Sequence, residues 1–487
     1  MNEKLWFKPK AFTHFTPKLF STDFVFVEQF SKNPKNILKH SFYPLIHKTI
    51  AVKRFKISQD RLGRHVKRHY TIKNGVRHSN VKYREVYYPT HLDSHIYAYY
   101  ANQVLGPLYQ IQLEKNPAVD AAVLAYRRIA VKGESRKKCN IDFANDLFEL
   151  VKATKGEVAV LALDITKFFD SLNHKKLKQA WCALRGETSL RPEEYNIFKS
   201  LVDFKFVEIQ DICKEFGFKH PNDIIKKKIN CFVQSPREFV SRIVDKGYVK
   251  GNPFRSKQTD LYPSTSKQPI GIPQGTPISA FLANLYLLNF DREVVKLLEP
   301  INGTYRRYSD DLVIVCPTVE YRQVENKIYD LIRHHELIIQ PEKTQETFFE
   351  NGKLVKGQKP LAYLGFIFDG RRKFIRASSL SKFYRKMKSR IRTKAFQAFY
   401  FKNKTIEEKM VLADGIIHRT QLYKKYSYLG SKNTNPKKRN YISYADLATK
   451  IMKSPEVKRQ LSKAWGTLHK GIEKWNKNLG LTNAPKK

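Results

Sequence analysis

The chain has 487 residues, of which 41% are hydrophobic and 13% aromatic, so it can bury a core and is not disordered as a whole. It carries 90 Lys and Arg residues against 45 Asp and Glu residues, a formal net charge of +45. Such self-repulsion is best tolerated when a polyanion neutralises it, which makes nucleic acid the first candidate partner and an anionic membrane the second. The absence of any run of roughly 18 apolar residues excludes a transmembrane helix.

The first ten residues and the cysteines indicate the compartment. The opening MNEKLWFKPK lacks the apolar stretch of a secretory signal. No Cys-x-x-Cys pair is present, which argues against structural zinc, and unpaired thiols in an unexported chain indicate a reducing cytoplasm. The five cysteines are Cys139, Cys182, Cys213, Cys231 and Cys316.

The N-terminal third is basic and rich in aromatic residues. Positive charges recur at short intervals between Arg64 and Arg84, and the tract is either a solvated surface or a surface that faces a polyanion. Apolar residues between 96 and 105 fall near helical spacing and predict a helix packed on a core. Residues 140–150 also have a helical pattern.

Two apolar segments deliver carboxylates to strand ends. Residues 158–163 have strand length and composition and end at Asp164. Residues 305–308 and 312–316 flank Ser309, Asp310 and Asp311, which predicts a hairpin with these three residues in its turn. Carboxylates placed in this way suit two Mg²⁺ ions, which prefer oxygen ligands and can activate a hydroxyl and stabilise a leaving pyrophosphate.

Further elements follow in chain order. Residues 261–268 are expected to form a loop, residues 271–277 a second loop, and residues 278–287 an apolar helix. A helix over 321–335 and strands over 337–339 and 363–368 are predicted. Residues 380–400 place Phe383, Met387 and Ile391 four residues apart among basic residues, which predicts an amphipathic helix with a phosphate-binding face.

Five motifs in a fixed order give the chain a specific resemblance. Tyr308-Ser309-Asp310-Asp311 resembles the Tyr-x-Asp-Asp box of reverse transcriptases, and residues 163–170 resemble their first catalytic motif. Pro273-Gln274-Gly275 is similar to the nucleotide-binding loop of the family. Residues 340–344 resemble the later motif that carries a lysine, and residues 363–366 the hairpin that grips the primer. The resemblance covers about residues 84–370.

The resemblance implies roles for the catalytic residues. Asp164 and Asp310 would bind both metal ions, with Asp311 as the third carboxylate, and Mn²⁺ can substitute for Mg²⁺. Lys343 would neutralise or protonate the leaving pyrophosphate, or is a surface lysine. The implied metal-site residues are Asp164, Ile165, Asp310 and Asp311.

It also implies roles in binding nucleotide and nucleic acid. Phe169 would exclude a ribose 2′-hydroxyl, with one of Phe168 and Phe169 packing in the core. Arg127 or Arg128 would clamp the triphosphate, and Gln274 and Gly275 would let the backbone approach the nucleotide. The expected contacts with template and product come from Tyr363, Leu364, Gly365, Lys382, Arg385, Lys388 and Arg392.

The implied fold is α+β: a right-hand polymerase with an antiparallel palm sheet backed by helices and a helical C-terminal extension. The expected domains are a basic N-terminal extension (1–59), fingers (60–155), a palm (156–370) with a helical insertion near 190–255, and a thumb with a basic helical region (371–487).

The resemblance implies an RNA-directed DNA polymerase, similar to bacterial retron enzymes and to stand-alone reverse transcriptases of phage defence. The expected partners are a structured non-coding RNA as template, the DNA product and deoxynucleoside triphosphates, without a membrane; a homo-oligomer is left open. The alternatives are a polymerase of the group II intron, telomerase or other mobile-element type, and a catalytically silent RNA-binding scaffold. No carboxylate cluster for an RNase H domain and no paired Cys or His ligands for an endonuclease follow residue 376.

Overall fold

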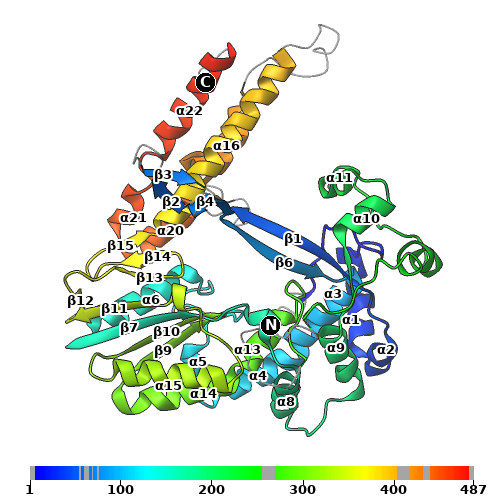
Figure 1. Ribbon diagram of the computed structural model, residues 1–487, viewed down its shortest axis with the longest axis horizontal. Helices are drawn as coiled ribbons and strands as arrows, with labels where there is room; N and C mark the ends of the chain where they lie inside the picture. Colours follow the sequence, from blue (N-terminus) through cyan, green and yellow to red (C-terminus); the bar gives the residue numbers. More distant parts are fainter. Residues whose placement is uncertain are drawn as a thin grey trace.

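The computed structural model describes residues 6–53, 56–59, 65–68, 70–73, 76–254, 269–402, 417–431 and 439–481. The loop predicted over 261–268 and part of the basic tract between Arg64 and Arg84 lie outside these residues. Figure 1 shows a sheet at the lower left, two long helices that project upward from it, and a helical region with a two-stranded ribbon on the right.

A five-stranded antiparallel sheet forms the centre of the molecule, in the order β12-β11-β7-β10-β9. The strand predicted over 158–163 and the predicted hairpin are confirmed as β7 and as β9 with β10, except that Asp311 begins β10 instead of lying in the turn. The strands are β7 (Glu157–Asp164), β9 (Thr304–Tyr308), β10 (Asp311–Pro317), β11 (Gln345–Glu350) and β12 (Lys353–Leu354).

Both faces of this sheet are buried, because apolar residues occupy successive positions of the central strands. Leu161 and Leu163 of β7 belong to one core cluster, with residues of α13 (Ser279–Tyr286), α14 (Leu288–Leu298) and α15 (Tyr321–His334). Val158 and Val160 point to the other face, where α6 (Asn140–Ala153) and the C-terminal region pack. The predicted helices near 140–150, 278–287 and 321–335 are thus confirmed.

The N-terminal part contains a second sheet, in the order β6-β1-β8. Strand β1 (Leu45–Lys53) pairs antiparallel with β6 (Val81–Tyr88) and parallel with β8 (Phe206–Glu208). The segment near 190–255 therefore contributes a strand to this sheet in addition to its helices. Two short hairpins follow β1: β2 (Lys56–Gln59) with β3 (His65–Arg68), and β4 (Tyr70–Lys73) with β5 (Val76–Ser79).

The other helical elements up to residue 254 surround these sheets. They are η2 (Ser21–Asp23), α1 (Phe24–Lys32), α2 (Pro34–Lys39), α3 (His91–Tyr99), η3 (Tyr100–Val104), α4 (Leu105–Glu114), α5 (Pro117–Ala122), α7 (Phe168–Ser171), α8 (His174–Arg185), α9 (Pro192–Val202), α10 (Ile209–Glu215), α11 (Pro221–Lys226), α12 (Pro236–Phe239) and η4 (Val240–Val244).

Two sequence predictions need correction. Residues 337–339 do not form a strand: Ile339 makes only an isolated bridge with Ile165. Residues 363–368 form a hairpin, β13 (Leu361–Tyr363) with β14 (Phe366–Phe368), and β15 (Lys373–Ile375) pairs with β14. The chain reverses at Leu364 and Gly365 because both have positive φ (45° and 93°), as a tight two-residue turn requires.

The C-terminal region is helical, as predicted. Helix α16 (Ala377–Lys402) buries Phe383, Met387 and Ile391 and packs against α22 (Ala464–Leu479); together they project from the sheet (Figure 1). The remaining elements are η5 (Glu299–Ile301), η6 (Pro341–Lys343), α18 (Arg419–Tyr426), α19 (Tyr428–Ser431), α20 (Tyr441–Met452) and α21 (Pro455–Arg459). In the described part of the chain, no helix combines the length and apolar character needed to cross a membrane.

Candidate active site

Three carboxylates meet at one edge of the central sheet. Asp164 is the last residue of β7 and Asp311 the first of β10, and the two are directly opposite each other in the antiparallel register. Opposite residues in such a pair have Cα atoms about 4.5–5.5 Å apart. The amide of Ile165 donates to the carbonyl of Asp310 at 3.0 Å, which fastens the turn carrying Asp310 to the end of β7.

The proximity of these carboxylates affects the pKa of Asp311. Burial, followed by repulsion from Asp310 and Asp164, raises the pKa of Asp311 to about 7. Lys343, on the short turn η6, donates a hydrogen bond to the Asp164 carboxylate. The amide of Gln340 also donates to the Asp164 carbonyl at 2.8 Å, so the lysine motif is attached directly to the strand that ends in the carboxylate.

The donor types at this edge fit a divalent cation. In the part of the chain that the structure describes, no three His, Cys, Asp or Glu side chains are already arranged around a common metal position. Asp164 and Asp311 nevertheless lie opposite each other in the register, with Asp310 in the adjoining turn, and their carboxylate oxygens are the donors that Mg²⁺ prefers.

The hairpin turn depends on contacts of Ser309 that the sequence motifs did not identify. Ser309 has a φ of 62°, a left-handed conformation that is uncommon for a residue other than glycine. Its carbonyl accepts a hydrogen bond from Arg307 at 3.3 Å, and its hydroxyl lies 2.9 Å from the hydroxyl of Tyr126. Arg307 and Tyr126 therefore hold the turn that presents Asp310.

Arg307 is fully buried and is paired with an equally buried Asp291. Its Nε and Nη2 atoms donate to the two carboxylate oxygens of Asp291 at 2.7 and 2.6 Å, and Nη1 donates to Asn284 at 2.9 Å. Tyr305 donates to the same carboxylate at 2.9 Å. Arg307 lies two residues after Tyr305 on β9, so both side chains are on the same, buried face of the strand. Because such positions normally hold apolar side chains, an arginine there was the one sequence feature that could have indicated a buried ion pair.

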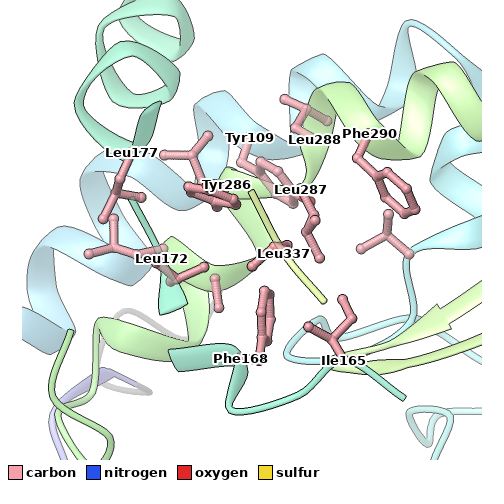
Figure 2. Packing of buried hydrophobic residues seen from close by; sticks show 14 of the residues in the cluster. Tyr109, Ile165, Phe168, Leu172, Leu177, Tyr286, Leu287, Leu288, Phe290 and Leu337 are labelled. Carbon is pink, nitrogen blue, oxygen red and sulfur yellow. The ribbon is translucent and has the colours of Figure 1, made fainter. Parts of the chain in front are cut away.

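The predicted nucleotide loop lies against α7, next to the two phenylalanines. The amide of Ile272 donates to the Phe169 carbonyl at 2.9 Å, and the amide of Gly271 to the Leu172 carbonyl at 2.8 Å. Phe168 is buried in the core cluster drawn in Figure 2, whereas Phe169 is only half-buried. Of the two, Phe169 is therefore the side chain that a nucleotide could reach.

Pro273, Gln274 and Gly275 pack on strand β6. The amide of Tyr87 donates to the Gln274 carbonyl at 2.8 Å. Gly275 has a φ of 125°, and a Cβ atom there would lie 2.6 Å from the Tyr87 carbonyl oxygen. The close backbone approach that this glycine permits in the structure is thus to β6. The Ser279 hydroxyl donates to the Pro273 carbonyl at 2.6 Å and steadies the loop.

The two candidate triphosphate ligands differ in availability. Arg127 donates to the carbonyls of Asp120 and Val123 at 2.7 and 2.6 Å, to the Asp120 carboxylate, and to Gln110 at 3.1 Å. Its guanidinium is therefore engaged by neighbouring groups of the chain. Arg128 is exposed, which makes it the better candidate of the pair.

The expected nucleic-acid contacts fall on two elements. Tyr363 is buried at the end of β13, and burial raises its pKa; Leu364 and Gly365 form the hairpin turn beyond it. The four basic residues of α16 that were expected to contact nucleic acid are exposed, and the Arg392 guanidinium lies 6.0 Å from the centre of the Trp475 ring. These four are Lys382, Arg385, Lys388 and Arg392.

Comparison with known proteins gives one family and several solved structures. Residues 130–368 match the family model of the reverse transcriptase (RNA-dependent DNA polymerase). No curated protein matches the chain.

The solved structures that are similar to this chain include telomerases. One is an apo telomerase from Candida tropicalis lacking its C-terminal domain: identity is 11%, 66% of this chain and 55% of that chain are covered, and the TM-score is 0.37. For apo telomerase from Candida tropicalis, identity is 11%, 82% of this chain and 64% of that chain are covered, and the TM-score is 0.37. For telomerase from Candida albicans in complex with a fragment of telomeric RNA, identity is 12%, 94% of this chain and 68% of that chain are covered, and the TM-score is 0.37. The chain thus spans about half to two thirds of the length of these structures.

The matched segment contains Asp164, Asp310, Asp311, Lys343 and the sheet that brings them together. Its strands and helices have the α+β architecture predicted from the motifs. Residues 130–368 therefore form a reverse transcriptase domain, of the RNA-dependent DNA polymerase class, with a right-hand polymerase fold.

Proposed function

We propose that this protein synthesises DNA on an RNA template from deoxynucleoside triphosphates. The observation that supports it most directly is the register of β7 with β10, which sets Asp164 opposite Asp311 with Asp310 in the adjoining turn. The reaction is tested by primer extension on an RNA template with purified protein and Mg²⁺. Extension with deoxynucleotides but not without divalent cation is expected.

Asp164, Asp310 and Asp311, with the backbone of Ile165, would hold two Mg²⁺ ions, and Mn²⁺ can take their place. When bound, the ions supply activation of the attacking hydroxyl and charge stabilisation of the leaving pyrophosphate. Lys343 lies beside Asp164, where its ammonium can neutralise the pyrophosphate. Arg128 binds the triphosphate from the fingers side. Ser309 and Arg307 keep Asp310 in place without contacting substrate.

Replacing Phe169 by Ala is expected to admit ribonucleotides, because the half-buried ring no longer fills the space of a 2′-hydroxyl. Discrimination by pocket shape is worth of the order of 10–200-fold, and the ratio of dNTP to rNTP incorporation measures it. Phe168→Ala is the control: it removes a core ring, which costs about 3–5 kcal/mol of stability, and leaves the ratio unchanged. An unchanged ratio in Phe169→Ala would transfer the steric role to another residue.

Reversing three charges on α16 is expected to weaken binding of the template–product duplex and to shorten products. The variant combines Arg385→Glu, Lys388→Glu and Arg392→Glu. Each lost phosphate contact lowers the slope of log K against log salt by about 0.7–0.9. A triple reversal at exposed Lys199, Lys214 and Lys219 matches the change in net charge. If both triple variants changed the salt slope equally, the basic residues of α16 would serve only solubility and would not bind the duplex.

The biological setting of the enzyme is proposed to be bacterial phage defence in the cytoplasm, with a structured non-coding RNA as template. Its support is the likeness of residues 91–97 and 125–144 to stand-alone defence reverse transcriptases. Sequencing the nucleic acid that copurifies with the protein identifies template, product and primer together. Phage plating on cells that express wild type or Asp310→Asn tests protection; equal plating would remove the defence role.

The alternatives make different predictions in the same experiments. A group II intron-like or other mobile-element enzyme copurifies with intron or element RNA. A silent scaffold binds RNA but does not extend a primer, and its phenotype survives Asp310→Asn. A homo-oligomer is compatible with each of these functions, and measuring the molar mass of the protein in solution determines its oligomeric state.

A further inference from the structure

A cavity of about 540 Å³ lies where the reverse transcriptase domain meets the C-terminal region. Its walls come from α6, from the turn between β14 and β15 together with β15, and from the segment that joins α20 to α21. In Figure 1 these elements lie together on one side of the central sheet, near the foot of α16 and α22. The volume is that of a ligand pocket, which is usually roughly 300–1,000 Å³.

This cavity and the candidate active site lie at opposite ends of β7. A Cβ atom on Gly352, in the turn between β11 and β12, would meet the carbonyl of Lys152 in the cavity wall. The adjoining Glu350 of β11 pairs with Glu157, the first residue of β7, whereas Asp164 is the last. A strand of 8 residues spans roughly 25 Å, so a ligand in the cavity does not reach the three carboxylates.

A buried lysine fastens the walls of the cavity to one another. Lys373 of β15 donates from Nζ to Asn145 of α6 at 2.6 Å, to the Glu149 carboxylate of α6, and to the Met452 carbonyl of α20 at 3.3 Å. The Ser454 hydroxyl donates to the Lys373 carbonyl at 2.8 Å. Three separate elements therefore meet at one side chain, and the cavity is preformed.

Five cationic and two anionic side chains line the cavity. Glu149 is paired with Lys373, so its carboxylate is already neutralised. Arg372 is paired at 3.0 Å with Asp369, whose carboxylate also accepts the amides of the turn. The three other cations are exposed and form no side-chain hydrogen bond or ion pair with any residue that the structure describes. They are Lys152, Arg371 and Lys453.

These three cations come from three different walls and face one space. Lys152 belongs to α6, Arg371 to the turn before β15, and Lys453 follows α20. The hydrogen bond from Lys373, followed by the charges of Lys152 and Lys453, lowers the pKa of Glu149, which places both lysines around that carboxylate. Lys453 has a φ of 49°, at a helix end where glycine is usual. Residues held in such a conformation cluster at ligand sites.

We propose that this cavity binds a small anion that carries two or more linked phosphates. One phosphate carries about 1.5–2 negative charges at neutral pH, so a diphosphate or triphosphate matches the three unpaired cations. The Arg371 guanidinium can bind phosphate oxygens in a bidentate way. The cavity is enclosed by three walls and is not an extended groove, which favours a small molecule over the backbone of a nucleic acid.

Binding would join the reverse transcriptase domain to the C-terminal helices, because β15 (Lys373–Ile375) leads almost directly into α16 (Ala377–Lys402). An anion held by Lys152 and Arg371 links α6 to the start of β15, and Lys453 adds the end of α20. A ligand that binds only the folded chain stabilises it by mass action. The thermal unfolding midpoint of wild type is therefore expected to rise with the concentration of the anion.

The test is isothermal titration calorimetry of the full chain with inorganic tripolyphosphate, in the presence of EDTA so that no divalent ion holds the probe at Asp164. Wild type is expected to bind one equivalent. Each lost charge-assisted contact weakens binding by at least about tenfold, so Lys152→Glu with Lys453→Glu should raise Kd at least about 100-fold. The same double variant should lose the tripolyphosphate-dependent rise in the unfolding midpoint.

Two further variants control for net charge and for folding. Lys199→Glu with Lys219→Glu makes the same charge change at exposed positions outside the cavity and should leave Kd unchanged. Glu149→Gln removes a negative charge from the wall but keeps an oxygen acceptor for Lys373. It should tighten binding by up to about fivefold, the contribution of an exposed charge pair. A misfolded variant cannot bind more tightly than wild type.

The source of the phosphates is distinguished by titrating ATP beside tripolyphosphate. Tighter binding of ATP supports the proposal with a nucleoside polyphosphate as the ligand, because Ile451 in the wall can contact a base. Tighter binding of tripolyphosphate supports it with an inorganic polyphosphate. Loss of affinity for single-stranded RNA in Lys152→Glu with Lys453→Glu, with tripolyphosphate binding unchanged, would overturn the proposal in favour of a nucleic-acid contact.

The inference is independent of the proposed function, and the two fail separately. Arg128→Glu, at the candidate triphosphate ligand, should leave the affinity for tripolyphosphate in EDTA unchanged. If Arg128→Glu weakened binding as much as Lys152→Glu with Lys453→Glu, the probe would occupy the candidate active site and the proposal would be overturned. Equal effects of the cavity pair and of Lys199→Glu with Lys219→Glu would also overturn it. Wild type that binds tripolyphosphate at the cavity but extends no primer contradicts only the polymerase activity.

Discussion

Replacing Asp310 by Asn is expected to abolish DNA synthesis while RNA binding stays largely intact. The substitution keeps the shape of the side chain and removes one charge from the edge where Asp164 and Asp311 meet. Loss of an outer-shell partner of a metal site already costs about 10–100-fold in activity, so loss of a direct ligand should exceed about 100-fold. Primer extension measures the activity, and filter binding of RNA measures the retained affinity. Asp164→Ala is expected to behave in the same way.

Asp330→Asn provides the matched control, because it is the same chemical change at an exposed position on α15. It should leave extension near the wild-type rate. Extension by Asp310→Asn at a comparable rate would contradict the assignment of the three carboxylates to the catalytic centre, and a parallel loss of RNA binding would point to misfolding instead.

Replacing Asp291 by Asn is expected to destabilise the protein by about 3–5 kcal/mol, because it leaves the Arg307 guanidinium buried without a counter-charge. The free energy of unfolding in urea measures the effect. Activity should fall as well, since Arg307 also holds the carbonyl of Ser309 in the turn that carries Asp310.

Two comparisons isolate the buried pair. The exposed pair of Arg333 with Asp330 should contribute less than about 1 kcal/mol, so Asp330→Asn serves here too. The double variant Arg307→Met with Asp291→Leu removes both charges and should recover much of the stability, but not the activity, because the donor to Ser309 is gone. A stability of Asp291→Asn within about 1 kcal/mol of wild type would contradict the account of the network.

Local sequence patterns were sufficient for three strands of the central sheet, β7, β9 and β10, and for α16, the helix with exposed basic residues. Short apolar runs predicted β7 and β10, and their flanking carboxylates fell at strand ends as expected. The four-residue spacing of Phe383, Met387 and Ile391 predicted the buried side of α16. Such predictions succeed because the signal, a period of two or near four residues, is contained within a single element.

The tertiary structure alone decided which polar groups are available. Arg127 and Arg128 are equivalent in sequence, yet Arg127 is engaged by Asp120, Val123 and Gln110 whereas Arg128 is exposed. Likewise, no local pattern pairs Arg307 with Asp291, because they lie on different elements and meet only when α14 packs on β9.

The same distinction explains the N-terminal sheet and the nucleotide loop. Strand β8 joins β1 from more than a hundred residues away, and Gly275 meets β6 across a similar gap. Composition and periodicity describe one segment at a time, so they determined which elements form and which faces are apolar. Which elements meet depends on packing between distant segments, and that packing decided where the loop, the ribbon and the buried ion pair lie.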